Sequence, residues 1–409
     1  MVGLPVGLLA AALRPAWREG LPERLGLRAP RADGPDPHWV HAASVGEVQA
    51  ALRLIDRLTG RGDALVASTT TLTGRALARR TRPGLATALA PLDHPWCVAA
   101  ALSRCAPRSL VLVETELWPS WIAGAERRQV PVLVVSGRIS DRSFPRYRRL
   151  SRWLEPTLRR LSAVGARSQR DAERFVALGV PERNVVVTGD LKLEPPAAPP
   201  ELAPDLGAAL ARVPYWVAGS THPGEEVAAW EATRALRREG ARLALVVAPR
   251  HPERIEAAAQ ALEAAGAKLT RRSASALPVL GDGEVLLLDT LGELAAVYSG
   301  ARAAFVGGTL VPVGGHNLLE PLQAGVPVLF GPHTSNARDG AELLLATGAG
   351  ARVDGEASLA AALGALLEDD AERHAGIARG RLALEDHRGA AERSAALLDR
   401  VLAGGGVAP

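Results

Sequence analysis

The sequence predicts an α/β protein of two domains, each built on a parallel sheet covered by helices. Short apolar runs alternate with amphipathic stretches, and this alternation is typical of parallel sheets. The chain has 409 residues, enough for two domains of roughly 150–200 residues each. A proline-rich segment, residues 194–204, interrupts the alternation near the middle of the chain. With 47% hydrophobic and 22% charged residues, the composition excludes a disordered or fibrous protein.

The first half of the chain contains five short apolar runs that we expect to be buried strands. They are His38–Ala42, Ala64–Ser68, Ser109–Glu114, Val132–Ser136 and Val185–Thr188. Amphipathic spacing predicts helices between them, for example over Val48–Leu58 and Gly74–Arg80. Proline cannot continue a central helix or strand, so residues 194–204 are expected to form a stiff linker.

The same alternation resumes after the linker. The predicted strands are Tyr215–Gly219, Leu243–Ala248, Val285–Leu288, Ala303–Val306 and Val326–Phe330, with a helix over Glu225–Arg238. We therefore expect domains at residues 1–193 and 205–409, with a last helix that could return to the first domain. Ligands of open α/β sheets bind beyond the carboxyl ends of the strands, so the two sheets are expected to face a central cleft.

The charge is divided unevenly between the two halves. Residues 1–190 contain 28 basic and 17 acidic side chains, whereas residues 191–409 contain 20 and 27. Arginines are dense over residues 138–183, with aromatic residues among them. Nucleic acid, anionic lipid and phosphorylated glycan are all possible partners of such a tract.

The amino terminus begins with an apolar stretch, Val2–Leu13, which Arg14, Trp17 and Arg18 follow. The stretch is shorter than the ~20 residues that a spanning helix needs. Two interpretations remain: a segment lying in a membrane surface, and a helix packed on the first domain.

Two acidic motifs of the first half follow predicted strands. In HAASVGEVQA, Ser44 and Glu47 have the spacing of a capping box, and Gly46 permits close backbone approach. Glu47 is alternatively a general base. In VETELWPSW, Glu114 and Glu116 follow the strand directly. Carboxylates there either bind a ligand or pair with arginines, because an unpartnered buried charge is costly.

Three motifs of the second half also follow strands. Arg250 in APRHPER stands where a guanidinium could bind phosphate. DTLGEL has a glycine in the turn before a helix. In VGGTLVPVGGHNLLEP, two glycine pairs flank a short loop, and His316 and Asn317 are expected to open a helix that carries Glu320.

Neither metal nor disulfide chemistry is indicated. The nine histidines are scattered and no HExxH motif occurs, while the two cysteines suit neither a disulfide framework nor a zinc site. We expect no metal site and no cofactor.

Together these motifs resemble the 3-deoxy-D-manno-octulosonic acid (Kdo) transferases of lipopolysaccharide assembly. The matching segments are HAASVGE, ETELWPS, SGRISDRSF, VTGDLKLE, AGSTHPGEE, APRHPER, DTLGEL, GGTLVPVGGHNLLEP and GVPVLFGPHTSN. The resemblance implies a GT-B fold of two Rossmann-like domains and an inverting, metal-independent reaction. CMP-Kdo would be the donor and co-substrate, and a lipid A precursor (lipid IVA) would be the acceptor.

The resemblance also implies residue roles. Glu47 would be the general base and Glu114 a second essential acid. The donor would be bound by Pro249, Arg250, Leu291, Gly292, Glu293, Gly307, Gly308, Gly314, Gly315, His316, Asn317 and Glu320. For the acceptor and its phosphates we expect Ser44, Gly46, Arg75, Arg138 and Arg142.

The expected location is the cytoplasmic face of the inner membrane, with peripheral or weak attachment to an anionic surface. One alternative is another GT-B enzyme, a UDP-sugar transferase or epimerase. A basic nucleic-acid-binding protein is a remote alternative, because it would leave the paired glycine loops without a role. We therefore expect no nucleic-acid partner.

Overall fold

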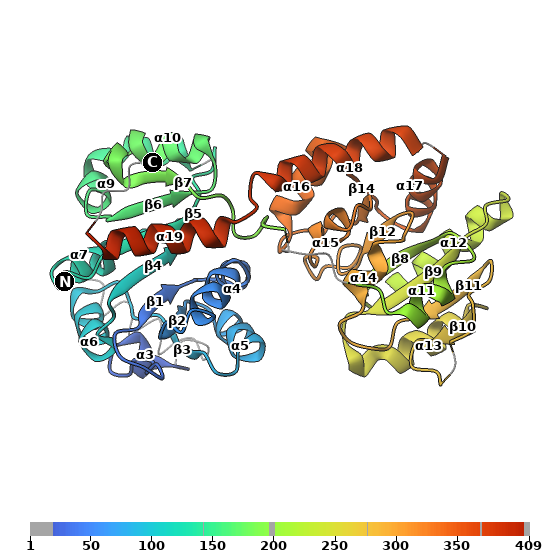
Figure 1. The fold of residues 1–409 in the computed structure, drawn as a ribbon, viewed down its shortest axis with the longest axis horizontal. Helices are drawn as coiled ribbons and strands as arrows, with labels where there is room; N and C mark the ends of the chain where they lie inside the picture. Colours follow the sequence, from blue (N-terminus) through green and yellow to red (C-terminus); the bar gives the residue numbers. More distant parts are fainter. Residues whose placement is uncertain (1–18, 142, 196–200, 276, 369, 405–409) are drawn as a thin grey trace. The chain divides into compact units, whose positions relative to one another are not determined.

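The computed structural model describes residues 19–141, 143–195, 201–275, 277–368 and 370–404. The chain divides into two compact units. Unit 1 comprises residues 1–194 together with 387–409, and unit 2 comprises residues 195–386. Each unit contains one seven-stranded sheet whose neighbouring strands pair in parallel (Figure 1). The predicted fold class, two α/β domains with parallel sheets, is confirmed.

The sheet of unit 1 has the strand order β3-β2-β1-β4-β5-β6-β7. Its strands are β1 (His38–His41), β2 (Leu65–Thr69), β3 (Ala86–Leu89), β4 (Ser109–Val113), β5 (Val132–Gly137), β6 (Ala163–Ala166) and β7 (Val185–Val187). Its helices are α3 (Leu21–Arg24), α4 (Val45–Thr59), α5 (Leu72–Thr81), α6 (Pro95–Cys105), α7 (Pro119–Glu126), α8 (Phe144–Arg149), α9 (Ser151–Leu158), α10 (Gln169–Ala177), the 3-10 turn η1 (Glu182–Asn184) and α19 (Ala390–Leu402).

The sheet of unit 2 has the strand order β10-β11-β9-β8-β12-β13-β14. Its strands are β8 (Tyr215–Thr221), β9 (Ala244–Pro249), β10 (Lys268–Arg271), β11 (Glu284–Leu287), β12 (Ala304–Val306), β13 (Val328–Phe330) and β14 (Gly350–Arg352). Its helices are α11 (Pro204–Leu210), α12 (Glu225–Arg238), η2 (Pro252–Arg254), α13 (Ile255–Ala264), α14 (Leu294–Tyr298), α15 (Leu319–Gln323), α16 (Arg338–Thr347), α17 (Glu356–Glu368) and α18 (Asp370–Glu385).

Four strands, β3, β6, β10 and β14, were not predicted. Strand β6 reads AVGA, small residues with little β-propensity. A Cβ at Gly165 would lie 2.6 Å from the Thr188 hydroxyl, so packing requires the glycine. Strands β3, β10 and β14 lie at sheet edges, where an apolar run is not needed because only part of the strand is buried.

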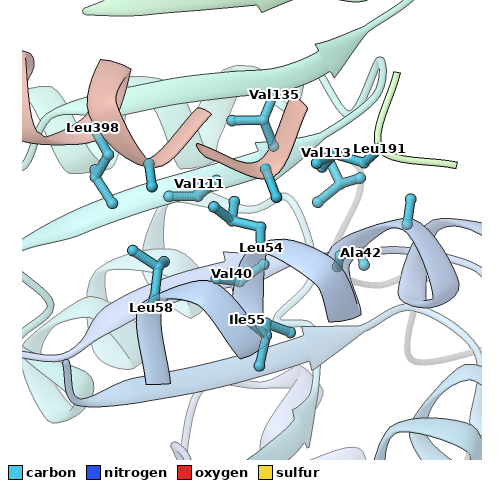
Figure 2. Close-up of a cluster of buried hydrophobic side chains, with 14 of the residues drawn as sticks. Val40, Ala42, Leu54, Ile55, Leu58, Val111, Val113, Val135, Leu191 and Leu398 are labelled. Carbon is cyan, nitrogen blue, oxygen red and sulfur yellow. The ribbon is translucent and has the colours of Figure 1, made fainter. Parts of the chain in front are cut away.

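Helix α19 comes from the end of the chain and belongs to unit 1. It packs beside α4, and Figure 2 shows Leu398 with Leu54 and Leu58 of α4 and Val111 of β4. The helix therefore completes the core over one face of the first sheet.

Parts of three predictions lie outside the described residues. These are the apolar stretch Val2–Leu13, Arg142, and most of the prolines of the expected linker. Within the described ranges, no helix is both long enough and apolar enough to span a membrane.

We expect the Leu398→Ala change to lower the free energy of unfolding by about 2–5 kcal/mol, because it opens a cavity in the core of unit 1. Leu402→Ala is the matched control on the same helix, since Leu402 is 37% exposed and should cost much less. Urea unfolding followed by tryptophan fluorescence measures both. Equal losses for the two variants would contradict the packing of α19 in this core.

Candidate active site

The acidic motifs of unit 1 lie where the strand order reverses. Strands β1 and β4 are neighbours and pair in parallel, although two other strands separate them in the chain. Ligands of open α/β sheets bind at such a switch point, beyond the carboxyl ends of the strands. Glu47 follows β1 and Glu114 follows β4, so both carboxylates lie at this position.

Glu47 occupies the first turn of α4, and Ser44 caps this helix as predicted, although the Glu47 carboxylate bonds the Ala43 amide where a capping box bonds the Ser44 amide. The Ser44 hydroxyl accepts a hydrogen bond from the Glu47 amide at 3.4 Å and donates to Glu47 Oε1 at 2.8 Å. The Ala43 amide donates to Glu47 Oε2 at 2.7 Å. Burial raises the pKa of Glu47, and the negative charges of Glu116 and Glu114 raise it further. Capping and proton transfer are therefore compatible, because one carboxylate can fulfil both roles.

Glu114 has a left-handed backbone, with φ +63°. This conformation ends β4 at Val113, one residue before the predicted end. A non-glycine residue in it costs about 1–2 kcal/mol, and such strain is concentrated at functional sites. The Glu114 carboxylate forms an ion pair with Lys192. A Cβ at Gly46 would lie 3.5 Å from the same ammonium group, which places Lys192 beside the start of α4.

Glu116 completes the group of carboxylates. It accepts a hydrogen bond from the Trp118 indole at 2.6 Å, and His41 Nε2 lies 3.7 Å from its carboxylate. Burial alone would raise the pKa of Glu116, but the contacts with His41 and Trp118 outweigh it and lower that pKa. Glu116 therefore keeps its negative charge and raises the pKa of Glu47.

The arginines predicted to bind the acceptor have different surroundings. Arg75 is buried and pairs with Glu19 at 2.5 Å and Glu23 at 3.1 Å, so its charge is already compensated. The Arg138 carbonyl accepts a hydrogen bond from the Thr115 hydroxyl, which ties the loop after β5 to the Glu114–Glu116 segment. The roles of both arginines stay predictions.

Unit 2 also carries its motifs at a reversal of strand order, between β8 and β12. The buried Glu225, in the first turn of α12, holds the loop that follows β12. Its carboxylate accepts backbone hydrogen bonds from His222, Gly308, Thr309 and Leu310, at 2.7–3.1 Å. This carboxylate thus fixes the first glycine pair next to the end of β8.

The glycine pairs are needed by the protein's own packing. A Cβ at Gly307 would lie 2.5 Å from the Ser220 carbonyl and 2.7 Å from the Glu225 carboxylate. Gly314 has φ +104°, and a Cβ there would lie 2.5 Å from the Asn336 amide and the Ser335 hydroxyl. Gly308 and Gly315 also have positive φ, and the Gly315 amide donates to the Gly308 carbonyl at 2.7 Å. The two pairs therefore form one closed loop.

A cluster of cationic and imidazole groups surrounds this loop. The rings of His222 and His316 stack at 5.2 Å, and their Nε2 atoms lie 2.9 Å apart. Burial lowers the pKa of His316 to about 4, and the charge of Arg250 contributes to the shift. Burial raises the pKa of Glu320, and Arg250 opposes that effect. Arg250, His316 and Glu320 are thus electrostatic neighbours, as a common donor site requires.

One expected helix begins later than predicted. Helix α15 starts at Leu319, not at His316, and has five residues. The Asn317 side-chain oxygen accepts a hydrogen bond from the Leu319 amide at 3.1 Å, which defines this start. His316 and Asn317 therefore lie in the loop before the helix, and Glu320 lies in its first turn.

The turn over Leu291–Glu293 begins with two exposed residues. Leu291 is 82% exposed and Gly292 has φ +90°. Glu293 pairs with Arg272 at 2.8 Å, so its carboxylate is already engaged. Pro249 ends β9 and orients the backbone before Arg250.

Three site residues escaped prediction: Lys192, His222 and Glu225. Lys192 is one of only two lysines in the chain, and its motif follows β7. His222 and Glu225 follow β8 in a segment that opens a helix. Position after a strand could have identified them, but their partners are distant in the sequence. In the described residues, no group of three or more histidine, cysteine, aspartate or glutamate side chains is arranged to hold a metal ion.

The sequence of the chain is similar to that of a known protein family. Residues 19–194 match the family model for 3-deoxy-D-manno-octulosonic-acid transferase (kdotransferase). A 3-deoxy-D-manno-octulosonic acid transferase of Bordetella pertussis is 37% identical, over 92% of this chain and 91% of that protein. One of Haemophilus influenzae is 33% identical, over 96% and 93%.

Solved structures support the fold. The calicheamicin glycosyltransferase CalG4 has a TM-score of 0.52 at 15% identity, over 90% of this chain and 100% of that one. MurG of Acinetobacter baumannii has a TM-score of 0.51 at 15% identity, over 89% and 99%. These neighbours confirm the GT-B architecture, and the relatives at 33–37% identity show that the chain belongs to the 3-deoxy-D-manno-octulosonic acid transferase family of glycosyltransferases.

Proposed function

We propose that this protein transfers Kdo from CMP-Kdo to a sugar hydroxyl of a lipid A precursor, with inversion at the anomeric carbon. The observation that carries the proposal is Glu47. Its carboxylate lies at the switch point of unit 1, and burial with two neighbouring acids raises its pKa. A carboxylate with a raised pKa is suited to general base catalysis, because it removes a proton more readily than an ordinary glutamate.

In this mechanism Glu47 takes the proton of the acceptor hydroxyl. The hydroxyl oxygen forms a bond to the anomeric carbon of Kdo while the bond from that carbon to the CMP phosphate oxygen breaks. The proton ends on Glu47, and the electron pair of the broken bond leaves with CMP. Each oxygen of Glu47 has a lone pair beyond those that accept from Ser44 and Ala43, so the carboxylate can accept the proton.

The neighbouring groups hold Glu47 in its working state. The ion pair with Lys192 compensates the charge of Glu114, which favours Glu114 as a positioning acid. Glu116 stays ionised through His41 and Trp118. In this arrangement the pKa of Glu47 is raised while that of its neighbour Glu116 is lowered.

Unit 2 would bind the donor through placed groups. We propose that Arg250 contacts the phosphate of CMP-Kdo, because a guanidinium binds phosphate bidentately and stabilises charge on a leaving phosphate. The closed glycine loop would shape the donor pocket, and Glu320 would accept hydroxyl hydrogens of the ribose. Glu225 acts indirectly, since it holds this loop through three backbone hydrogen bonds and joins it to the His222 amide by a fourth. In this proposal CMP-Kdo is a co-substrate and the protein uses no cofactor.

We expect the protein to add Kdo to a lipid A precursor incubated with CMP-Kdo, detected by mass spectrometry. Glu47→Gln should lower the rate by roughly 10²–10⁴-fold while CMP binding survives. The control is Glu173→Gln on the exposed side of α10. Wild-type rates in Glu47→Gln would remove Glu47 from the role of base, and no product with wild-type protein would reject the function.

We expect the rate of transfer to fall as the pH decreases through the raised pKa of Glu47, because only the ionised carboxylate accepts a proton. Glu116→Gln removes a negative neighbour that raises this pKa. The acidic limb of kcat/KM against pH should therefore move to lower pH, by roughly one unit or less. Glu126→Gln, in the same unit, should leave the limb in place. A limb that moves upward would contradict the assignment.

We expect Arg250→Ala to weaken CMP binding by roughly 10- to 100-fold, because it removes a charged hydrogen-bonding group. Isothermal titration with CMP measures the loss. Arg302→Ala, an exposed arginine of unit 2, is the control. Unchanged affinity would exclude Arg250 from the donor site. Tight binding of UDP in place of CMP would instead favour a UDP-sugar enzyme.

A further inference from the structure

The arginine-rich tract of unit 1 consists of two parts with different surroundings. Five of its later arginines form ion pairs with carboxylates: Arg159, Arg160, Arg167, Arg170 and Arg174. Four arginines nearer its start lie on α8 and at the start of α9. For Arg146, Arg148, Arg149 and Arg152, no carboxylate lies within 4.0 Å among the residues that the structure describes. These four side chains are all exposed.

Apolar side chains accompany the unpaired arginines. Trp153 is 83% exposed and Leu150 is 47% exposed, whereas Phe144, Tyr147 and Leu154 pack partly against the core. The segment 143–154 contains no acidic residue. A hollow of about 400 Å³ is lined by Phe144, Pro145, Arg148 and Arg149. We call this surface, residues 144–153, the α8–α9 surface.

Helix α8 follows the loop that leaves β5 at the carboxyl edge of the first sheet, and α9 leads back toward the start of β6. The hydrogen bond from Thr115 to the Arg138 carbonyl ties that loop to the segment of Glu114 and Glu116. The loop that precedes the surface is therefore tied to the segment that carries these carboxylates.

We propose that the α8–α9 surface docks on the anionic headgroups of a lipid bilayer, with Trp153 and Leu150 inserted at the boundary of the acyl chains. An exposed tryptophan beside unpaired arginines is the composition of an interfacial segment, because the indole partitions into the headgroup region and the guanidinium groups attract anionic lipid. Arginine also contacts lipid phosphates bidentately. This inference rests on the proposed function, since the proposed acceptor is a lipid embedded in the bilayer on which the surface would dock.

Nucleic acid fits the surface less well. Aromatic side chains that bind single strands present their ring faces as a stacking platform along a basic groove. Here Tyr147 is partly packed against the core, and the exposed leucine provides no stacking surface. The combination of one exposed tryptophan with one exposed leucine favours lipid.

The test is sedimentation of the full chain with vesicles of equal parts phosphatidylcholine and phosphatidylglycerol, and with vesicles of phosphatidylcholine alone. We expect binding to the anionic vesicles that weakens with added salt, because salt screens the arginine charges. The double variant Arg148→Gln/Arg149→Gln should bind roughly 30-fold more weakly, and Trp153→Ser roughly ten-fold more weakly.

Matched controls are available in the same unit. Arg79→Gln/Arg80→Gln changes an adjacent, exposed pair on α5, and Trp96→Ser changes a tryptophan that is 53% exposed on α6. Both controls should bind like the wild type. Equal losses in the controls, or binding that the α8–α9 variants leave unchanged, would overturn the proposal. Tighter binding of a single-stranded oligonucleotide that competes with the vesicles would also overturn it.

A detergent assay separates this inference from the proposed function. With CMP-Kdo and a detergent-solubilised lipid A precursor, the α8–α9 variants should retain wild-type transfer, because the bilayer is absent. Wild-type protein that transfers Kdo in detergent but fails to bind anionic vesicles would refute the docking surface and leave the function intact. Vesicle binding without transfer would support the surface and refute the function.

Discussion

The reversal of strand order in each sheet is the constraint on which both candidate sites depend. In unit 1 it lies between β1 and β4, and in unit 2 between β8 and β12. Because parallel strands all end at one edge, and the connections on either side of the reversal lead in opposite directions, the loops leave that edge open. Glu47 and Glu114 follow the two strands of the first reversal, and His222 and Gly307 follow those of the second. The same topological feature therefore places the proposed chemistry of both units.

Three carboxylates at one switch point would repel one another, and the structure compensates two of them. Glu114 pairs with Lys192, and Glu116 lies beside His41 and the Trp118 indole. Within the described part of the chain, the groups that donate to the Glu47 carboxylate are neutral, the Ser44 hydroxyl and the Ala43 amide. Its pKa therefore rises while that of Glu116 falls. Divergent pKa values among adjacent acids are how a protein distinguishes a proton acceptor from fixed charges.

The sequence was sufficient for what depends on local pattern. Central strands such as β4 and β9 are continuous apolar runs, so they were predicted, and the cap of α4 by the Ser44 side chain follows from its spacing to Glu47. Strand β6 was missed because it consists mostly of small residues with little β-propensity. One of them, Gly165, is required because a larger side chain would clash with Thr188. The start of α15 was misplaced because Asn317 forms a side-chain hydrogen bond to Leu319. The pairing of Lys192 with Glu114 joins positions 78 residues apart, and no local pattern contains that information.

Glu225 and Glu47 show how surroundings decide what a glutamate at the start of a helix does. Glu47 follows β1 and Glu225 follows β8, which are the strands that come first along the chain in their sheets. Both carboxylates accept backbone hydrogen bonds. Glu225 accepts four of them and is 1% exposed, so its oxygens are saturated and inaccessible. Glu47 accepts one from the Ala43 backbone at its carboxylate and keeps lone pairs that remain partly accessible. The first arrangement can only hold a loop, whereas the second leaves lone pairs that can accept a proton, as the proposed role of Glu47 requires.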